Sequence, residues 1–170
     1  MGLFLVKAVY FFVSIILVIL ADQWTKSLVL AKFAYGESVA LIPDWFSLTY
    51  VRNTGAAFGF LADANPSFRV PFFMVVPLIA MVVLGLLYRD LPKGSRYRAI
   101  SLGLVSGGAL GNLIDRVRLG YVVDFLDFHW KTAWYFPAFN VADSAICVGV
   151  GILLLATFKQ EEGQRASDAS

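Results

Sequence analysis

The sequence predicts an all-α membrane protein with four transmembrane helices, a small extracytoplasmic β element and an interfacial aromatic loop. Hydrophobic residues make up 59% of the 170 residues, charged residues only 15%, and the mean hydropathy is +0.72. A soluble domain of this length is more polar. Crossing a bilayer takes about 20 apolar residues, and four segments come close to that length: 8–28, 70–88, 99–116 and 138–158. We expect residues 1–170 to form a single integral membrane domain.

The spans differ in how clearly the sequence marks them. The first is an apolar run after Lys7 with no small-residue cleavage site before Asp22, so we expect a retained helix rather than a cleaved leader. The second has 19 residues without a charge, from Val70 to Tyr88. The fourth has only 15 uncharged residues after Asp143, so a full-length span must include this carboxylate. A polar tail, 159–170, follows it.

An even number of spans places both termini on one side of the membrane. Lys and Arg residues number seven on each side, but four of them crowd the ten-residue segment RDLPKGSRYR. This density favours a cytoplasmic location for the segment and for both termini. Outside, segment 36–60 alternates and carries turn residues, which predicts the β element. Segment 119–135 is rich in aromatic residues, which predicts a loop along the membrane interface.

Polar residues gather near the outer ends of the predicted spans. Asp22 and Lys26 are four residues apart on the first helix, so they share a face and can pair. The other members of the group lie at the end of the third span, in the aromatic segment and at the start of the fourth span: Asn112, Asp115, Arg116, Asp124, Asn140, Asp143 and Ser144. Ionisable residues at membrane depth are costly and mark functional sites. The sequence therefore predicts one polar site near the outer leaflet.

A pair of aspartates is the chemistry that this site favours. If Asp124 and Asp143 lie close together, they share a proton, and the pair can activate water for attack on a carbonyl group. The only histidine, His129, lies among aromatic residues, which argues against a histidine-activated nucleophile. Lys26 and Arg116 would compete with a metal ion for the carboxylates. We therefore expect neither a metal nor a cofactor.

The polar and small residues also allow other interpretations. Asp143 could simply cap the fourth helix, but Asn140 already supplies a good cap. Intramembrane carboxylates also occur in proton-coupled transporters, and the glycine row of the third span could serve a non-enzymatic assembly subunit. In that row we expect Gly103 and Gly107 to pack helices, whereas Gly108 and Gly111 leave room for a ligand. A formal charge of +2 gives no reason to expect nucleic acid.

Five blocks resemble those of the lipoprotein signal peptidases, the signal peptidase II family. In order along the chain they are DQWTK, NTGAAF, GGALGNLIDR, VVDF and FNVADS, between Asp22 and Ser144. The resemblance implies an aspartic endopeptidase with Asp124 and Asp143 as the catalytic pair. It implies that the residues around substrate or pair are Asn53, Gly55, Asn112, Asp115, Arg116 and Asn140, with Asp22 and Lys26 bracing the site. We expect Gly108, Val122 and Ser144 to belong to the same site.

The same resemblance implies the partners and the location. The substrates would be diacylglyceryl-modified prolipoproteins, cut just before the lipidated cysteine, and they would enter from the membrane lipid. Cyclic peptide antibiotics of the globomycin type would inhibit the enzyme. The location would be the bacterial cytoplasmic (inner) membrane. From the residues themselves we expect a multi-pass monomer, because one subunit contains every needed part, with its active site near the outer leaflet. We further expect Arg116 to pair with Asp115, Asn53 or Asn140 to bind the oxyanion, and Asp127 to be a solvated acid.

Overall fold

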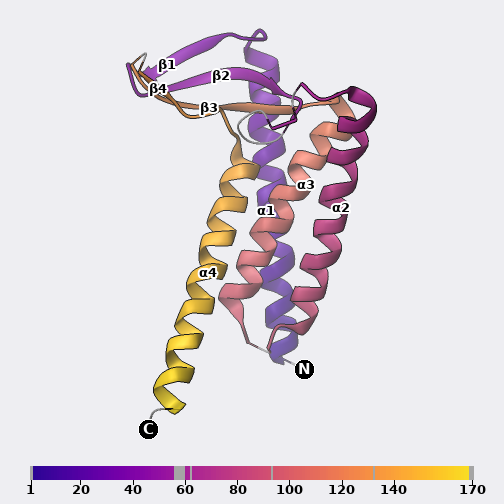
Figure 1. Cartoon of the computed structure of the whole chain (residues 1–170), viewed down its shortest axis with the longest axis vertical. Helices are drawn as coiled ribbons and strands as arrows, with labels where there is room; N and C mark the ends of the chain where they lie inside the picture. The colour runs from indigo at the N-terminus through magenta and orange to yellow at the C-terminus, as the bar shows by residue number, and fades with distance from the viewer. Residues whose placement is uncertain (1, 56–59, 62, 93, 132, 169–170) are drawn as a thin grey trace.

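A computed structural model shows four helices and four short strands. It describes residues 2–55, 60–61, 63–92, 94–131 and 133–168, without the side chains of 2–5 and 159–168. The elements follow in the order α1 (Gly2–Lys32), β1 (Ser38–Ile42), β2 (Phe46–Asn53), α2 (Pro66–Asp90), α3 (Arg96–Leu119), β3 (Val122–Trp130), β4 (Trp134–Tyr135) and α4 (Val141–Asp168). The sheet lies across one end of the helical bundle, and the N-terminus lies at the other end (Figure 1).

Three of the described helices are long and apolar enough to cross a membrane. They are Val6–Lys32, Pro66–Asp90 and Val141–Phe158. The helix α3 has 24 residues, a length of about 36 Å at the usual helical rise, but its composition does not meet the same criterion. The structure therefore supports three spans directly, together with the small antiparallel sheet.

The position of α3 explains its weaker hydropathy. It packs against α1, α2 and α4, so much of its surface faces protein rather than lipid. Its glycines allow close approach: a Cβ at Gly103 would lie 2.6 Å from the Phe11 carbonyl oxygen, and one at Gly107 would lie 2.8 Å from Val18 Cβ. Small residues at helix contacts are the usual device in membrane bundles. The predicted packing role of Gly103 and Gly107 is thus confirmed.

The sheet corrects the prediction of an aromatic loop. The four strands are antiparallel in the order β1-β2-β3-β4, and β2 pairs with β3 so that Ser47 faces Asp127 and Val51 faces Asp124. Segment 119–135 thus holds two strands, because it continues the hairpin begun by β1 and β2. The first half of β3 packs into the bundle end, where Val123 and Phe125 join Val29 in an apolar cluster.

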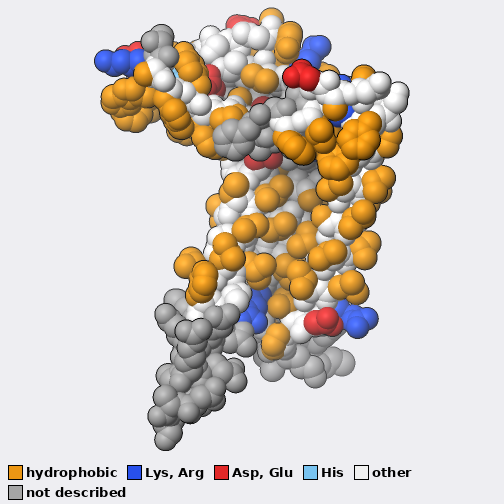
Figure 2. Space-filling view, viewed as in Figure 1, with side chains coloured by type: hydrophobic (Ala, Val, Ile, Leu, Met, Phe, Trp, Pro, Cys, Tyr) orange, Lys and Arg blue, Asp and Glu red, His pale blue; other side chains and the backbone are white. Residues whose placement is uncertain are grey.

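The distribution of side chains is the reverse of that in a soluble protein. Large apolar residues are exposed on α1, α2 and α4, for example Leu20, Val82 and Leu155. Figure 2 shows apolar side chains over much of the bundle surface. By contrast, Asp22 and Lys26 are among the largest fully buried side chains. Such an arrangement is stable when the solvent around the helices is lipid. The chain is therefore a multi-pass membrane protein.

Candidate active site

Two carboxylates share one buried lysine beneath the sheet. Lys26 Nζ lies 2.9 Å from Asp22 Oδ2 and 3.0 Å from Asp115 Oδ2, with all three side chains at most 3% exposed. The i,i+4 spacing on α1 gives the first pair, as predicted, and the close approach of α3 supplies Asp115. Backbone groups complete the cluster, because Ala142 N–H donates to Asp22 Oδ1 and Val123 N–H donates to Asp115 Oδ2. The cluster therefore ties α1, α3, β3 and α4 together.

Gln23 belongs to this cluster, although the sequence patterns did not predict it. Its Nε2 donates to Asp22 Oδ2 at 3.1 Å, to Asp115 Oδ1 at 2.9 Å and to the Gly111 carbonyl at 3.2 Å. Its Oε1 accepts a hydrogen bond from Arg118. Two carboxylates beside one lysine leave an excess of negative charge, and these amide donors offset it. Gln23 follows Asp22 directly in the DQWTK block, so its position in that block indicated that it belongs to the site.

Asn112 connects the cluster to Asp143. Lys26 Nζ donates to Asn112 Oδ1 at 3.0 Å, which leaves the amide NH₂ group facing the other way. That group donates to Asp143 Oδ1 at 2.8 Å. The lysine therefore fixes which end of the Asn112 amide faces Asp143.

Asn140 and Asp143 begin α4 as a reciprocal cap. Asn140 precedes the first helical residue, and its Oδ1 accepts a hydrogen bond from Asp143 N–H at 2.9 Å. In return, Asp143 Oδ2 accepts from Asn140 N–H at 3.3 Å. This is the arrangement of a capping box. Asp143 thus does help to cap α4, the role that we set aside. Only its Oδ2 takes part in the cap, and its Oδ1 accepts the hydrogen bond from Asn112.

Asp124 lies on β3 and is almost fully buried, with 1% of its surface exposed. Asn53 Nδ2 donates to its Oδ2 at 2.9 Å and Asn140 Nδ2 donates to its Oδ1 at 2.7 Å. Burial raises the pKa of the Asp124 carboxyl to about 7, and the negative charge of Asp143 acts in the same direction. The hydrogen bonds from the two asparagines oppose this rise without cancelling it. Asp124 is therefore an acid that holds a proton near neutral pH.

Arg116 makes its hydrogen bond elsewhere than at Asp115, although the Asp115 charge still acts on its guanidinium as expected. Arg116 Nη2 donates to the Gly55 carbonyl at 2.9 Å, and its guanidinium carbon lies 4.9 Å from the Phe73 ring centroid. Asp115 instead forms its ion pair with Lys26, because adjacent residues on a helix point in different directions. Arg116 thus holds the chain just after β2, where Gly55 N–H also donates to Asn53 Oδ1.

A cavity of about 460 Å³ opens beside these groups. Its polar wall consists of Asn53, Asn112, Arg116, Asp143 and Ser144, and its apolar wall includes Val122, Ala138, Phe139 and Cys147. Asp143 thus lines the cavity, whereas Asp124 is not one of its lining residues. The Ser144 hydroxyl donates to the Asn140 carbonyl, so it supports the start of α4.

The remaining predicted residues lie outside the cavity. A Cβ at Gly108 would collide with the Ala142 carbonyl oxygen, and one at Gly111 would lie 2.6 Å from Asp22 Oδ2. The missing side chain at Gly108 thus makes room for α4, and that at Gly111 makes room for the Asp22 carboxylate. The prediction that these two glycines leave space for a ligand is wrong. Asp127 is not simply solvated, because Thr49 donates to its Oδ2 at 3.3 Å.

His129 stands apart from the carboxylates. Its ring stacks on Tyr135 with centroids 5.6 Å apart, and its Nδ1 lies 3.6 Å from Asp127 Oδ1. Within the described part of the chain, no group of three His, Cys, Asp or Glu side chains is arranged to hold a metal ion. The chemistry available to the cavity therefore comes from two carboxylates in different surroundings, three asparagine amides and one arginine.

Comparisons with known proteins agree with one another. The family model described as Signal peptidase (SPase) II matches residues 14–159. The chain is 52% identical over 143 residues to a lipoprotein signal peptidase of Syntrophotalea carbinolica, covering 84% of this chain and 87% of the relative. It is 49% identical over 156 residues to that of Shewanella loihica, covering 92% and 90%. For Pseudomonas aeruginosa the values are 44% over 152 residues, with 89% of each chain covered.

Two solved structures share the fold. One is a bacterial membrane enzyme determined by the in meso method at 2.3 Å resolution; it superposes with a TM-score of 0.79 at 32% identity, over 89% of this chain and 88% of that one. The other, a bacterial membrane enzyme at 1.9 Å resolution, gives 0.76 at 31% identity, over 86% and 91%. The likeness therefore covers both the helices and the sheet.

Proposed function

Since this chain belongs to the signal peptidase II family and is a membrane peptidase, we propose that it cleaves prolipoprotein signal peptides with Asp124 and Asp143 as its catalytic pair. The cut falls just before the cysteine that carries the diacylglyceryl group. The observation that carries the proposal is the position of Asn140, which donates to Asp124 Oδ1 at 2.7 Å and to Asp143 Oδ2 at 3.3 Å. One residue thus orients both carboxylates.

The two aspartates take different roles because their surroundings differ. Asp124 is enclosed and its pKa is raised to about 7, so it donates a proton to the scissile carbonyl oxygen. Asp143 lines the cavity, where its ionised form accepts a proton from the attacking water. When the tetrahedral intermediate collapses, the C–N bond breaks, the proton on Asp143 passes to the leaving amine, and ionised Asp124 takes back a proton from one hydroxyl of the intermediate, which restores both carboxyl groups. No metal or cofactor takes part in this scheme.

The amides and Arg116 position other groups of the site and do not react themselves. The Nδ2 groups of Asn53 and Asn140 both donate to Asp124, so they orient the acid instead of binding the oxyanion as first expected. Arg116 fixes the chain around Gly55 at the rim of the cavity. The apolar wall accepts small side chains that precede the cut, and the diacylglyceryl chains remain in the surrounding lipid.

Four crossings of the bacterial inner membrane fit this function. Three described helices meet the requirements for spanning, and α3 becomes the fourth span because its neighbours shield its polar residues. Both termini then lie in the cytoplasm, and the site lies near the outer leaflet. A C-terminal fluorescent fusion that requires cytoplasmic folding should therefore fluoresce, and a periplasmic reporter at the same place should stay inactive. One subunit contains every proposed group, so a monomer suffices.

Inhibitors of the globomycin type should occupy the same cavity. A cyclic peptide with an apolar tail presents carbonyl groups and lipid-like surface together, as the cavity requires. Competitive inhibition of prolipoprotein cleavage tests this proposal. Inhibition that is independent of substrate concentration would contradict it.

The central experiment compares four forms of the purified protein on a diacylglyceryl-modified prolipoprotein. Wild type should cleave before the lipidated cysteine, Asp124→Asn and Asp143→Asn should be inactive while folded, and a chelator should have no effect. Asp127→Asn is the matched control, because Asp127 lies on the same strand and contacts Thr49 rather than the cavity. It should keep near-normal activity. Substantial cleavage by either pair variant would reject the proposed pair, and absence of cleavage by wild type would favour transport.

A further inference from the structure

A second cavity lies at the opposite end of the bundle from Asp143. Its volume is about 500 Å³, and it lies where α1, α3 and α4 meet. Arg96, at its edge, is 16 residues before Asn112 on the same helix, a separation of about 24 Å along the axis. Figure 1 shows α4 leaning away from the other helices at this end. The cavity therefore lies on the bundle surface at the end where α3 begins, far from the sheet.

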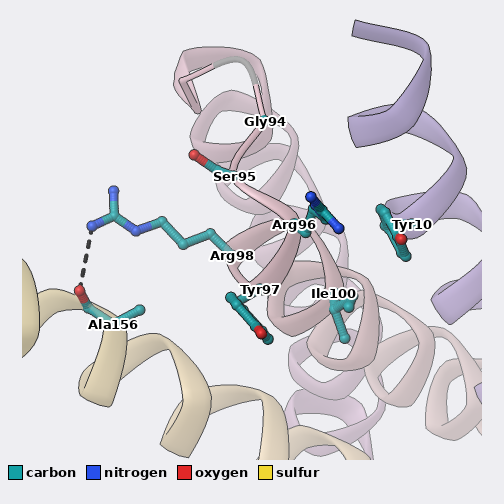
Figure 3. A pocket seen from close by; sticks show the side chains of 8 residues that line it. All are labelled: Tyr10, Gly94, Ser95, Arg96, Tyr97, Arg98, Ile100 and Ala156. Carbon is teal, nitrogen blue, oxygen red and sulfur yellow. Dashed lines mark hydrogen bonds between the residues drawn. The ribbon is translucent and has the colours of Figure 1, made fainter. Parts of the chain in front are cut away.

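Two arginines give the cavity its charge. Figure 3 shows Arg98 reaching across toward α4, where its Nη2 donates to the Ala156 carbonyl at 3.5 Å. Arg96 is exposed on the other side of the opening, toward Tyr10 (Figure 3). Of the described residues that line the cavity, none is acidic. The cavity thus attracts an anion.

The surroundings identify the kind of anion. Tyr10 and Tyr97 line the cavity beside the arginines, and Tyr97 is 77% exposed. Tyrosine rings favour the level of lipid headgroups. Next to the opening, the outer faces of α1 and α4 expose large apolar side chains, including Val9 and Leu155. A ligand that fits both features has an anionic head and long apolar chains.

We propose that this cavity binds the headgroup of an anionic phospholipid, with the phosphate at the opening that Arg96 and Arg98 border and the acyl chains along α1 and α4. Basic pockets between transmembrane helices are known to accept such headgroups. The guanidinium groups supply several donors at fixed angles to the phosphate oxygens. The inference does not depend on the proposed peptidase chemistry, because the cavity shares no residue with the active site.

Native mass spectrometry of the full chain in a non-ionic detergent tests the proposal. Wild type should retain phosphatidylglycerol in preference to phosphatidylcholine with the same acyl chains. Arg96→Gln/Arg98→Gln should weaken phosphatidylglycerol binding by about twenty-fivefold, since each arginine at a membrane surface contributes about fivefold. Arg89→Gln is the matched control, because Arg89 lies at the end of α2 beside Asp90 and outside the cavity. It should bind as wild type does.

Two further measurements distinguish a specific lipid site from general attraction to the basic segment. Arg98 also contacts α4, so Arg96→Gln alone should weaken binding by about fivefold without changing the melting temperature in phosphatidylcholine. Equal loss in Arg89→Gln and in the double variant would overturn the proposal, because any basic residue at this end would then attract the lipid equally. Displacement of the lipid by millimolar inorganic phosphate would also overturn it, because the acyl chains would then contribute nothing.

Discussion

Asn140 and Asp143 hold each other at the first turn of α4 through two hydrogen bonds, of 2.9 and 3.3 Å. The same Asn140 side chain donates to Asp124 at 2.7 Å and to Asn112 Oδ1 at 3.1 Å. The capping box thus does more than stabilise a helix end. Asn140 also holds the strand carboxylate of Asp124, so helix capping and the geometry of the proposed catalytic pair depend on one residue.

Substitution at Asn140 can separate these two roles. Asn140→Ala removes both the cap and the Nδ2 donor, so the free energy of unfolding should fall by about 1 kcal/mol, and cleavage should fall by about a hundredfold because Asp124 loses its orientation. Asn140→Ser keeps a good cap but lacks the long amide. It should recover the stability and not the activity. Thermal unfolding and initial cleavage rates measure the two effects, and full activity in Asn140→Ser would contradict the orienting role.

The pH dependence of cleavage should report Asp124. If Asp124 is the proposed acid, it must be protonated to donate, and because its pKa is about 7, kcat/KM should fall about tenfold per pH unit above that value. The measurement is kcat/KM from pH 5 to pH 9 in a constant detergent and salt. A constant rate up to pH 9 would show that the protonated form of Asp124 is not required.

Stability should depend on the same group. Folded Asp124 keeps its proton to about pH 7, whereas an unfolded aspartate releases it near the ordinary value of 3.8. The folded chain therefore binds more protons between these values, and the free energy of unfolding falls as pH rises from about 4 to about 7. Asp124→Asn should flatten that part of the profile, which denaturation at several pH values would measure.

Lys26 should be essential for stability because it forms ion pairs with two buried carboxylates. Lys26→Met leaves Asp22 and Asp115 without a cation and should lower the free energy of unfolding by about 3 to 5 kcal/mol. Adding Asp115→Asn should restore part of the loss, since one carboxylate then remains beside the Gln23 amide. Denaturation of both variants in mixed micelles measures this. Equal stability of the two would contradict the electrostatic origin of the loss.

Arg116 should affect cleavage more than folding. Arg116→Ala removes the hydrogen bond to the Gly55 carbonyl at the cavity rim, so KM should rise with only a small change in melting temperature. Arg118→Ala is the matched control on the same helix, because Arg118 is exposed and contacts Gln23 instead. It should cleave almost normally. A large loss of thermal stability in Arg116→Ala with normal turnover would show that the residue only stabilises its helix.

Local spacing predicted part of this site, and contacts through space decided the rest. The Asp22–Lys26 pair follows from the i,i+4 rule, and the glycine row of α3 follows from its four-residue period. The ion pair of Asp115 was missed because sequence proximity favoured Arg116, whereas the closeness of α1 and α3 selects Lys26.

The strand β3 was missed for a different reason. Its VVDFLDFHW segment has the polar residues Asp124, Asp127 and His129, which are unevenly spaced, so it lacks the clean alternation that marks a half-exposed strand. Only its pairing with β2 shows that Asp124 lies on a rigid element. Sequence reasoning thus found the proposed catalytic residue but not the structure that holds it.

Gly108 should tolerate no side chain, because α3 and α4 meet there. An added methyl group would collide with the Ala142 carbonyl oxygen and lie 2.7 Å from an Ile146 carbon, one turn from Asp143. Gly108→Ala should lower the free energy of unfolding by about 1 to 3 kcal/mol and reduce cleavage, since α4 carries the proposed catalytic carboxylate. Gly151→Ala is the control, because a methyl group at Gly151, on the same helix as Asp143, meets nothing within 4 Å. Unfolding and cleavage of the two variants would measure the contrast, and equal behaviour would show that α4 shifts freely without disturbing the site.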